Sequence, residues 1–223
     1  MKRVAIIGGT GDQGLGLALR FAQANVPVII GSRDETKANI AVEQVQESFP
    51  QADIKGMDNN AAVENGEIIL LSVPYKYMAD TIKSIKSELT PDKIVVSLCV
   101  PLANAVGGRP TQVVSPWEGS AAEQAAAMVP KGVPLVGAFH NVCAARLLDI
   151  ENTVDNDVVV CSDDKDARQE VMALADKIDG VRGLNGGNLC NCRIVESMTA
   201  LIIGMNIRYK LPKGMGVRFT YLY

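Results

Sequence analysis

The sequence predicts an α/β fold whose core is a doubly wound, mostly parallel sheet, and three observations support this prediction. Short apolar runs rich in β-branched residues, typical of buried strands, recur through residues 1–140. Segments of helical composition separate these runs, as they do in βαβ units. A glycine-rich turn follows the first apolar run and opens the first helical segment. This combination is typical of a Rossmann-type sheet with right-handed crossovers between its parallel strands.

The expected elements alternate along the chain. Strands are expected at 4–7, 28–30, 67–73, 93–97 and 133–139. Helices are expected at 15–24, 35–47, 75–89 and 120–129. Beyond residue 150 the pattern thins to strands at 157–161 and 181–184, helices at 165–178 and 188–209, and an extended aromatic end at 216–223. We therefore expect a Rossmann-type domain at 1–150 and a small α+β C-terminal domain at 151–223 that packs against it.

The composition excludes several classes of protein. Of the 223 residues, 48% are hydrophobic and 21% are charged, which is enough apolar material for a packed core. The net charge of −3 argues against a nucleic-acid-binding surface, and the longest apolar run is too short to span a membrane. His140 is the single histidine, so zinc sites built on several histidines are excluded and no metal is expected.

The cysteines favour a reducing, cytoplasmic setting. There are five, an odd number, and no two of them have Cys-x-x-Cys spacing. The apolar stretch near the start is interrupted by glycines too early for a signal peptide. Cys190 and Cys192 admit two interpretations: a redox pair, or two small residues at the start of a helix.

The turn after the first strand has the pattern of a dinucleotide-binding loop. Gly9, Gly11 and Gly14 fit G-x-G-x-x-G between a strand and a helix. The first glycine permits a tight turn, the second lets the backbone approach a pyrophosphate, and the third lets the helix pack on the strand. The helix N-terminus then offers free amide groups to the phosphates. The alternative is a glycine turn with a structural role only.

The end of the second strand predicts NADP rather than NAD. An NAD site usually places Asp or Glu there to bind the ribose 2′-hydroxyl. This chain has Ser32 and Arg33, with Lys37 one helical turn later, and these groups favour a 2′-phosphate. Asp34 and Glu35 belong to the first helical turn, where the helix dipole favours acidic residues. The alternative is a solvated, charged helix start.

The second substrate is expected at the carboxyl ends of the strands, where open α/β sheets bind ligands. These ends lie at 73–75, 97–101 and 139–142 and are mostly apolar. Ala79 follows Tyr75 by one helical turn, and the small Ala144 follows His140 by four residues and lets a flat ring approach. His140 is the one candidate proton carrier at these ends, and a core histidine is an equally good interpretation.

Further motifs resemble one family across nearly the whole chain. They are the first strand with its glycine turn, the group Ser32, Arg33 and Lys37, and the segments 55–59, 93–97, 120–123, 140–146, 179–180 and 191–199. Together they resemble the coenzyme F420-dependent NADP oxidoreductases of archaea. The glycine turn occurs in many folds, whereas the segment 193–199 is far more discriminating.

The resemblance implies a Rossmann domain with a smaller C-terminal domain, a dimer, and reversible hydride transfer between the deazaflavin F420 and NADP. By position, the resemblance implies that the pyrophosphate is held by Thr10, Gly11, Asp12 and Gln13, and the 2′-phosphate by Ser32, Arg33 and Lys37. It implies that the NADP cleft is lined by the strand end Val73, Pro74 and Tyr75 together with Ala79 and Ala144. It also implies that His140 and Val142 lie beside the deazaflavin ring. The chain departs from the family pattern at Tyr75, where Trp is expected, and at 141–143, where Thr-Ile-Pro is expected.

We expect the hydride to pass directly between C5 of F420 and C4 of the nicotinamide. The cofactors carry this chemistry and the protein stacks their rings, so no general base is required. Two other functions remain open: an NADPH-dependent reductase of a small imine or ketone, which needs a proton donor, and a non-catalytic NADP(H) sensor. Residues 151–223 are too few for a large substrate domain, and we expect them to cover the cleft and to contribute to a dimer contact.

Overall fold

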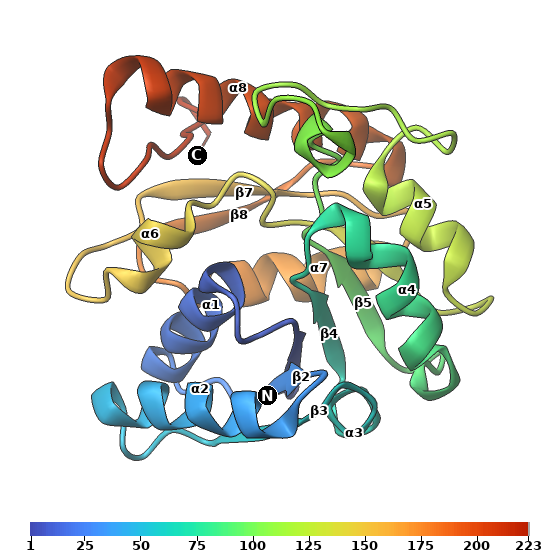
Figure 1. The fold of residues 1–223 in the computed structure, drawn as a ribbon, viewed down its shortest axis with the longest axis vertical. Helices are drawn as coiled ribbons and strands as arrows, with labels where there is room; N and C mark the ends of the chain where they lie inside the picture. Colours follow the sequence, from blue (N-terminus) through green and yellow to red (C-terminus); the bar gives the residue numbers. More distant parts are fainter. Residues whose placement is uncertain (223) are drawn as a thin grey trace.

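The structure is a computed structural model that describes residues 1–222 (Figure 1), so Tyr223 of the expected extended end lies outside the described residues. Within this range a six-stranded sheet has the order β3-β2-β1-β4-β5-β6, and all of its neighbouring strands are parallel. The strands are β1 Val4–Ile7, β2 Val28–Ser32, β3 Ile54–Asp58, β4 Ile68–Leu71, β5 Ile94–Ser97 and β6 Leu135–Gly137. This order is that of the doubly wound fold, which confirms the predicted fold class.

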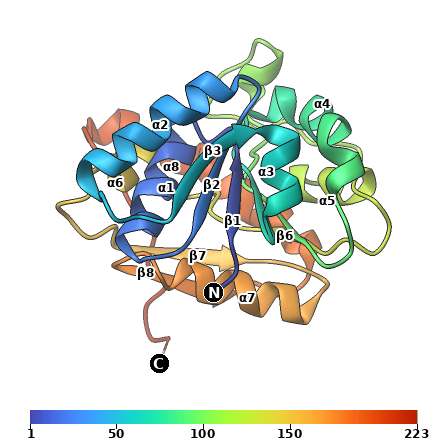
Figure 2. The ribbon, with the colours of Figure 1, turned by 90° about the horizontal axis from the view of Figure 1, so that it is seen from below.

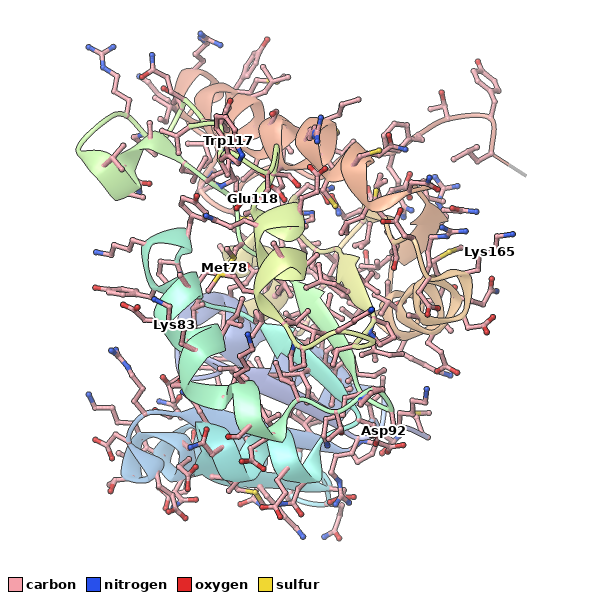
Figure 3. The ribbon with its side chains drawn as sticks, turned by 90° about the vertical axis from the view of Figure 1, so that its right-hand side faces the viewer. Met78, Lys83, Asp92, Trp117, Glu118 and Lys165 are labelled. Atoms are coloured by element: carbon pink, nitrogen blue, oxygen red, sulfur yellow. The ribbon has the colours of Figure 1, made fainter. Side chains whose placement is uncertain are left out.

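Helices cover both faces of the sheet (Figure 2). One face carries α1 Asp12–Gln23, α2 Glu35–Ser48 and α6 Ala144–Leu148, and the other carries α3 Asn59–Asn65, α4 Tyr75–Ile85 and α5 Ala121–Met128. All four residues of β1 and of β4 are buried, because both of their faces are covered. In Figure 3, Met78 lies on the side of α4 that faces α5 and Lys83 lies on its outer side.

The last third of the chain adds a two-stranded parallel sheet, β7 Asn156–Val160 and β8 Val181–Asn185, joined by α7 Lys165–Ala175. A short 3₁₀ turn leads into α8 Cys192–Tyr209, which runs along one end of the molecule beside the loop 102–119 (Figure 1). Apolar side chains of β7 and α7 share one hydrophobic cluster with those of β1 and α1. The core is therefore continuous across residue 150, and the division into two domains there stays a prediction.

Besides a 3₁₀ turn at Ala103–Val106, three described elements have no counterpart in the sequence expectations. They are the edge strand β3 and the short helices α3 and α6. Ile54 is the one buried residue of β3 in the described chain, so the strand lacks the continuous apolar run that marks its neighbours. The expected extended end forms no strand within 216–222. It is nevertheless bound to β7, because the amide of Asp157 donates a hydrogen bond to the carbonyl oxygen of Val217 at 2.7 Å. No helix in the described part of the chain has the length and apolar character needed to cross a membrane.

Candidate active site

The glycine turn between β1 and α1 forms a close-packed cradle. A Cβ on Gly14 would lie 2.6 Å from the Cα of Gly9, and a Cβ on Gly9 would lie 2.9 Å from the carbonyl oxygen of Ile6. Gly11 differs, because its nearest atom lies at 3.7 Å, and the residue borders an open cleft. The helix begins at Asp12, directly after this glycine, so its first amides face the same cleft. The turn has the shape and polarity that a pyrophosphate requires.

The end of β2 presents cations beside this turn. Ser32 is buried and its hydroxyl accepts a hydrogen bond from the amide of Asp34 at 3.2 Å. Asp34 in turn caps α2 by accepting from the amide of Thr36 at 3.0 Å, so the carboxylates belong to the helix start as the sequence predicts. Arg33 and Lys37 are exposed and form no ion pair within residues 1–222. This arrangement suits an anionic 2′-phosphate.

A cleft of about 440 Å³ opens where the strands β4, β5 and β6 end. It is lined by Gly11, Asp12, Gln13, Ser72, Val73, Pro74, Tyr75, Leu98, Cys99, Val100, Leu102, Phe139, His140, Asn141, Val142, Cys143, Thr199, Ile202, Ile203 and Asn206. Most of these side chains are apolar. Asp12 is the one carboxylate among the described lining residues, and no lysine or arginine joins them. The cleft therefore suits an uncharged aromatic ring next to the anion-binding turn.

The structure brings only some of the predicted site residues together in this cleft. Gly11, Asp12, Gln13, Val73, Pro74, Tyr75, His140 and Val142 line it, whereas Gly9, Thr10, Gly14, Ser32, Arg33, Lys37, Ala79 and Ala144 lie outside its lining. Sequence reasoning missed one whole wall, the α8 residues Thr199, Ile202, Ile203 and Asn206. Their spacing of i, i+3, i+4 and i+7 puts them on one helix face, and this periodicity is the signal that could have found them.

His140 does not reach the cleft through its imidazole. The side chain is 0% exposed, so the part that borders the cleft is main chain. Neither ring nitrogen has a hydrogen-bond partner among the described residues, and burial lowers the pKa of His140 to about 4. The interpretation as a core histidine is thus correct for the ring, which is neutral near pH 7.

Burial also shifts the pKa of other groups around the cleft. Burial raises the pKa of the Cys99 thiol to about 12 and raises the pKa of Tyr75. Two further hydroxyls at the strand ends, those of Ser72 and Ser97, are buried without a hydrogen-bond partner among residues 1–222. Unpaired polar atoms are rare in folded proteins, and their concentration at these strand ends marks the site.

The cysteines do not form the redox pair that the sequence left open. Cys190 is exposed, whereas Cys192 is buried, and all five cysteines are free. A Cβ on Gly137 would lie 2.2 Å from the sulfur of Cys192, so this thiol packs against β6. Within the described residues, no group of three or more His, Cys, Asp or Glu side chains is arranged to hold a metal ion.

Comparison with known proteins places the chain in a family. A family model described as "NADP oxidoreductase coenzyme F420-dependent" matches residues 3–101. A protein of Methanocaldococcus jannaschii named "F420-dependent NADP reductase" is 48% identical over 224 residues, which cover 99% of each chain. The chain belongs to the coenzyme F420-dependent NADP oxidoreductase family. The family resemblance stated from the sequence motifs is thereby confirmed.

One further sequence relative agrees with this family assignment, and one solved structure agrees with the fold. The "F420-dependent NADP reductase" of Methanothermobacter thermautotrophicus is 43% identical over 225 residues, covering 100% of this chain and 96% of that protein. A crystal structure of a putative F420-dependent NADP-reductase from an Arthrobacter species superposes with a TM-score of 0.80, covering 98% of this chain and all of that one. Its sequence is only 20% identical, so this comparison supports the fold alone.

Proposed function

We propose that the protein catalyses reversible hydride transfer between coenzyme F420 and NADP. The observation that carries this proposal is a single cleft in a member of this family: the glycine cradle opens directly into an apolar space of about 440 Å³. Such a cleft suits two stacked rings that react with each other.

The five cysteines are free thiols, which supports a reducing, cytoplasmic location.

The cradle and the end of β2 are the parts that would hold NADP(H). The loop Gly9, Thr10, Gly11, Asp12, Gln13 and Gly14 would bind the pyrophosphate, Ser32, Arg33 and Lys37 the 2′-phosphate, and Val73, Pro74, Tyr75, Ala79 and Ala144 the remaining length of the nucleotide. The close contacts of Gly9 and Gly14 and the free α1 amides support the first assignment. Arg33 and Lys37 support the second, because both are exposed and neither forms an ion pair within residues 1–222, although Arg33 lies 5.7 Å from the centre of the Tyr77 ring.

The deazaflavin of F420 would lie against the turn 139–142 and α8. His140 and Val142 line this end of the cleft, and the buried imidazole means that His140 contributes main-chain atoms there. When both substrates are bound, their rings supply the hydride chemistry, and one proton is taken up for each F420 reduced. The protein orients the rings and excludes water, which an apolar cleft does well.

The proposed function is tested by mixing the full chain with NADPH and oxidised F420 and following the deazaflavin absorbance. We expect bleaching with NADPH and much slower bleaching with NADH. NADPH oxidation with a cyclic imine in place of F420 would instead identify an imine reductase. Tight NADPH binding without turnover of either substrate would identify a sensor, and both results would refute the proposal.

We propose further that residues 151–223 form a C-terminal domain that covers the cleft and contributes to a homodimer. Exposed apolar side chains on two neighbouring segments support this, since α8 runs beside the loop 102–119 (Figure 1). They include Val106, Trp117, Ile194, Leu201, Ile207 and Tyr209, each more than half exposed. Figure 3 shows Trp117 with Glu118 on that loop, at the α8 end of the molecule. Sedimentation of the full chain as a dimer is the expected result.

A further inference from the structure

Two polar side chains, Thr199 and Asn206, interrupt the apolar wall that α8 gives to the cleft. Ile202 and Ile203 lie between them and have no side-chain donor or acceptor. The hydroxyl of Thr199 donates a hydrogen bond to the carbonyl oxygen of His140 at 2.8 Å, so its proton is already used inside the protein. Asn206 is thus the residue of this wall that can offer a side-chain hydrogen bond to a ligand, and the orientation of its amide decides what it recognises.

A main-chain group fixes the orientation of the Asn206 amide. The N–H of Met215 donates a hydrogen bond to Oδ1 of Asn206 at 3.0 Å. A main-chain N–H can only donate, and exchanging the oxygen and nitrogen of the side chain would set two donors against each other. The oxygen therefore faces Met215, and Nδ2 carries two N–H donors. No hydrogen bond within residues 1–222 uses these donors.

The segment after α8 holds this anchor in place. After α8 the chain turns back on itself (Figure 1), and the amide of Leu211 donates to the carbonyl oxygen of Asn206 at 3.1 Å. Arg146 on α6 donates from its guanidinium to the carbonyl oxygen of Gly214 at 3.1 Å, directly before Met215. Because both sides of the Met215 amide are held, the Asn206 side chain has its orientation before any ligand binds.

The free nitrogen of Asn206 lies beside Cys143, at the end of the cleft where α6 begins. A Cβ on Gly214 would lie 3.2 Å from Nδ2 of Asn206 and 2.7 Å from Sγ of Cys143, so both atoms border the same point. Asn206 and Cys143 both line the cleft. When an apolar ring displaces water from a mostly apolar cleft, an N–H donor left without a partner costs binding free energy. A ligand that fits this wall must therefore bring an acceptor to Asn206.

We propose that Asn206 binds the deazaflavin directly, with Nδ2 donating a hydrogen bond to a carbonyl oxygen of the pyrimidine part of the ring system. This inference rests on the proposed function, which assigns the α8 wall to that ring. The pyrimidine part carries two carbonyl oxygens, whereas the rest of the ring system is largely apolar and matches the isoleucines beside Asn206. A single fixed donor on an apolar wall therefore selects one orientation of the ring.

The same hydrogen bond strengthens during the reaction. The C4–H bond of the reduced nicotinamide breaks, and its electron pair forms the new C5–H bond of the deazaflavin. The electrons displaced from C5 pass to the nitrogen and carbonyl oxygens of the pyrimidine part, and one proton taken up from water then neutralises this charge. A donor already fixed at a carbonyl oxygen stabilises the charge as it develops. Asn206 should therefore affect the rate of hydride transfer as well as the binding of F420.

The side-chain amide of Asn206 reports on this contact without turnover. Its NH₂ group gives a pair of signals in ¹H–¹⁵N NMR spectra of the full chain, assigned by their absence from N206D and by their proximity to the amide of Met215. Oxidised F420 is added to the chain saturated with NADP⁺, a combination that cannot react. We expect F420 to move one of the two proton signals downfield and NADP⁺ alone to leave both nearly unchanged. Signals that respond to NADP⁺ instead, or that stay unchanged when the deazaflavin absorbance shows F420 bound, would overturn the inference.

Single-turnover kinetics then test the effect on the rate. N206D keeps the shape of the side chain and an oxygen for the Met215 amide, but it replaces the free donor with an acceptor. N65D is the matched control, because Asn65 donates its side-chain amide to the carbonyl oxygen of Ala61 at 2.9 Å on α3, at the opposite end of the molecule from α8 (Figure 1). With F420 and NADPH both saturating, we expect hydride transfer to slow about 30-fold in N206D and to be unchanged in N65D, with the KM for NADPH within about twofold in both.

A loss of rate below about threefold in N206D, or an equal loss in N65D, would contradict the role of Asn206. Should N206D fail to fold, the wild-type NMR titration decides, since the contact with Met215 assigns the signals without a substitution. A wild-type chain that binds NADPH and F420 without transferring a hydride refutes the proposed function, and the Asn206 signals still report whether the ring contacts this side chain. Conversely, normal turnover with unmoved signals leaves the proposed function intact and overturns this inference alone.

Discussion

The buried guanidinium of Arg20 joins the two helices that flank the proposed NADP site. It is 1% exposed and donates hydrogen bonds to the carbonyl oxygens of Arg146 at 2.8 Å, Leu147 at 2.9 Å, Asp149 at 2.6 Å and Asn152 at 2.9 Å. The first helix, α1, carries the glycine cradle, and α6 begins with Ala144. Their close approach depends on Gly16, where a Cβ would lie 2.6 Å from the Cβ of Leu147.

The substitution Arg20→Met removes the donors but keeps an unbranched apolar stem of similar length. A hydrogen bond to a charged group contributes about 1.5–3 kcal/mol, and breaking a buried charged network by removing one partner costs about 3–5 kcal/mol. Because four carbonyl oxygens lose their donor together, we expect the free energy of unfolding to fall by about 4 kcal/mol. At about 3 °C per kcal/mol for a chain of this size, the Tm should fall by about 12 °C.

Thermal and urea unfolding of R20M and of a matched control, R3M, measure this effect. Arg3 pairs with Asp53 at 3.0 Å on the surface, and such exposed pairs contribute at most about 1 kcal/mol. The control should therefore lose no more than about 3 °C. The KM for NADPH should rise in R20M alone, because α1 and α6 both flank the proposed nucleotide site. Equal losses of Tm in the two variants would refute the reasoning that burial of the guanidinium decides its contribution.

Two further predictions concern the cofactor and acid stability. Replacing Arg33 with Ser and Lys37 with Ala should raise the KM for NADPH about tenfold or more and leave that for NADH nearly unchanged, which initial rates with each nucleotide would check. For Asp157, burial alone would raise the pKa, but hydrogen bonds from Arg182, the Phe219 amide and Arg218 outweigh it and lower the pKa to about 2. Its contribution to stability is thus present above pH 3.8, its unfolded value, and is lost as the pH falls toward 2. Urea unfolding of D157N should show lower stability at pH 7 and a flatter acid dependence, and an unchanged acid slope would contradict the assignment.

The parts of the fold that the sequence predicted are those in which local pattern and burial coincide. The strands β1, β2, β4, β5 and β6 are short, fully buried and mostly apolar, so composition alone marks them. The edge strand β3 escaped because its residues are mostly half-exposed, and α6 because a helix of five residues leaves no periodic pattern. The helix start at Asp34 was readable, since this side chain caps an amide only two residues later.

The candidate site likewise has parts that local sequence patterns mark and parts that form only when distant segments of the chain pack together. The glycine cradle and the cations after β2 are local patterns, so the sequence alone is enough to propose them as the nucleotide end of the site. The face of α8 that forms the other wall has a readable helical period, but its placement against the cleft is not local, because the bond between Thr199 and His140 joins residues 59 positions apart. The orientation of His140 was also hidden from the sequence: an imidazole that follows an apolar strand can face a ligand or the core, and only the folded structure shows that its side chain is 0% exposed.

The buried imidazole also bears on which chemistry the cleft can support. A reductase of small imines or ketones needs a side-chain donor that faces its substrate. His140 turns its ring away from the cleft, Cys99 holds its proton with a pKa of about 12, and burial raises the pKa of Tyr75. The described lining is mostly apolar, with Asp12 as its one carboxylate and no lysine or arginine, and the phenol of Tyr75, which keeps its proton, is the acidic hydroxyl left at the cleft. Such a wall serves a reaction in which a hydride passes between two bound rings, because orientation, and not acid catalysis, then limits the rate.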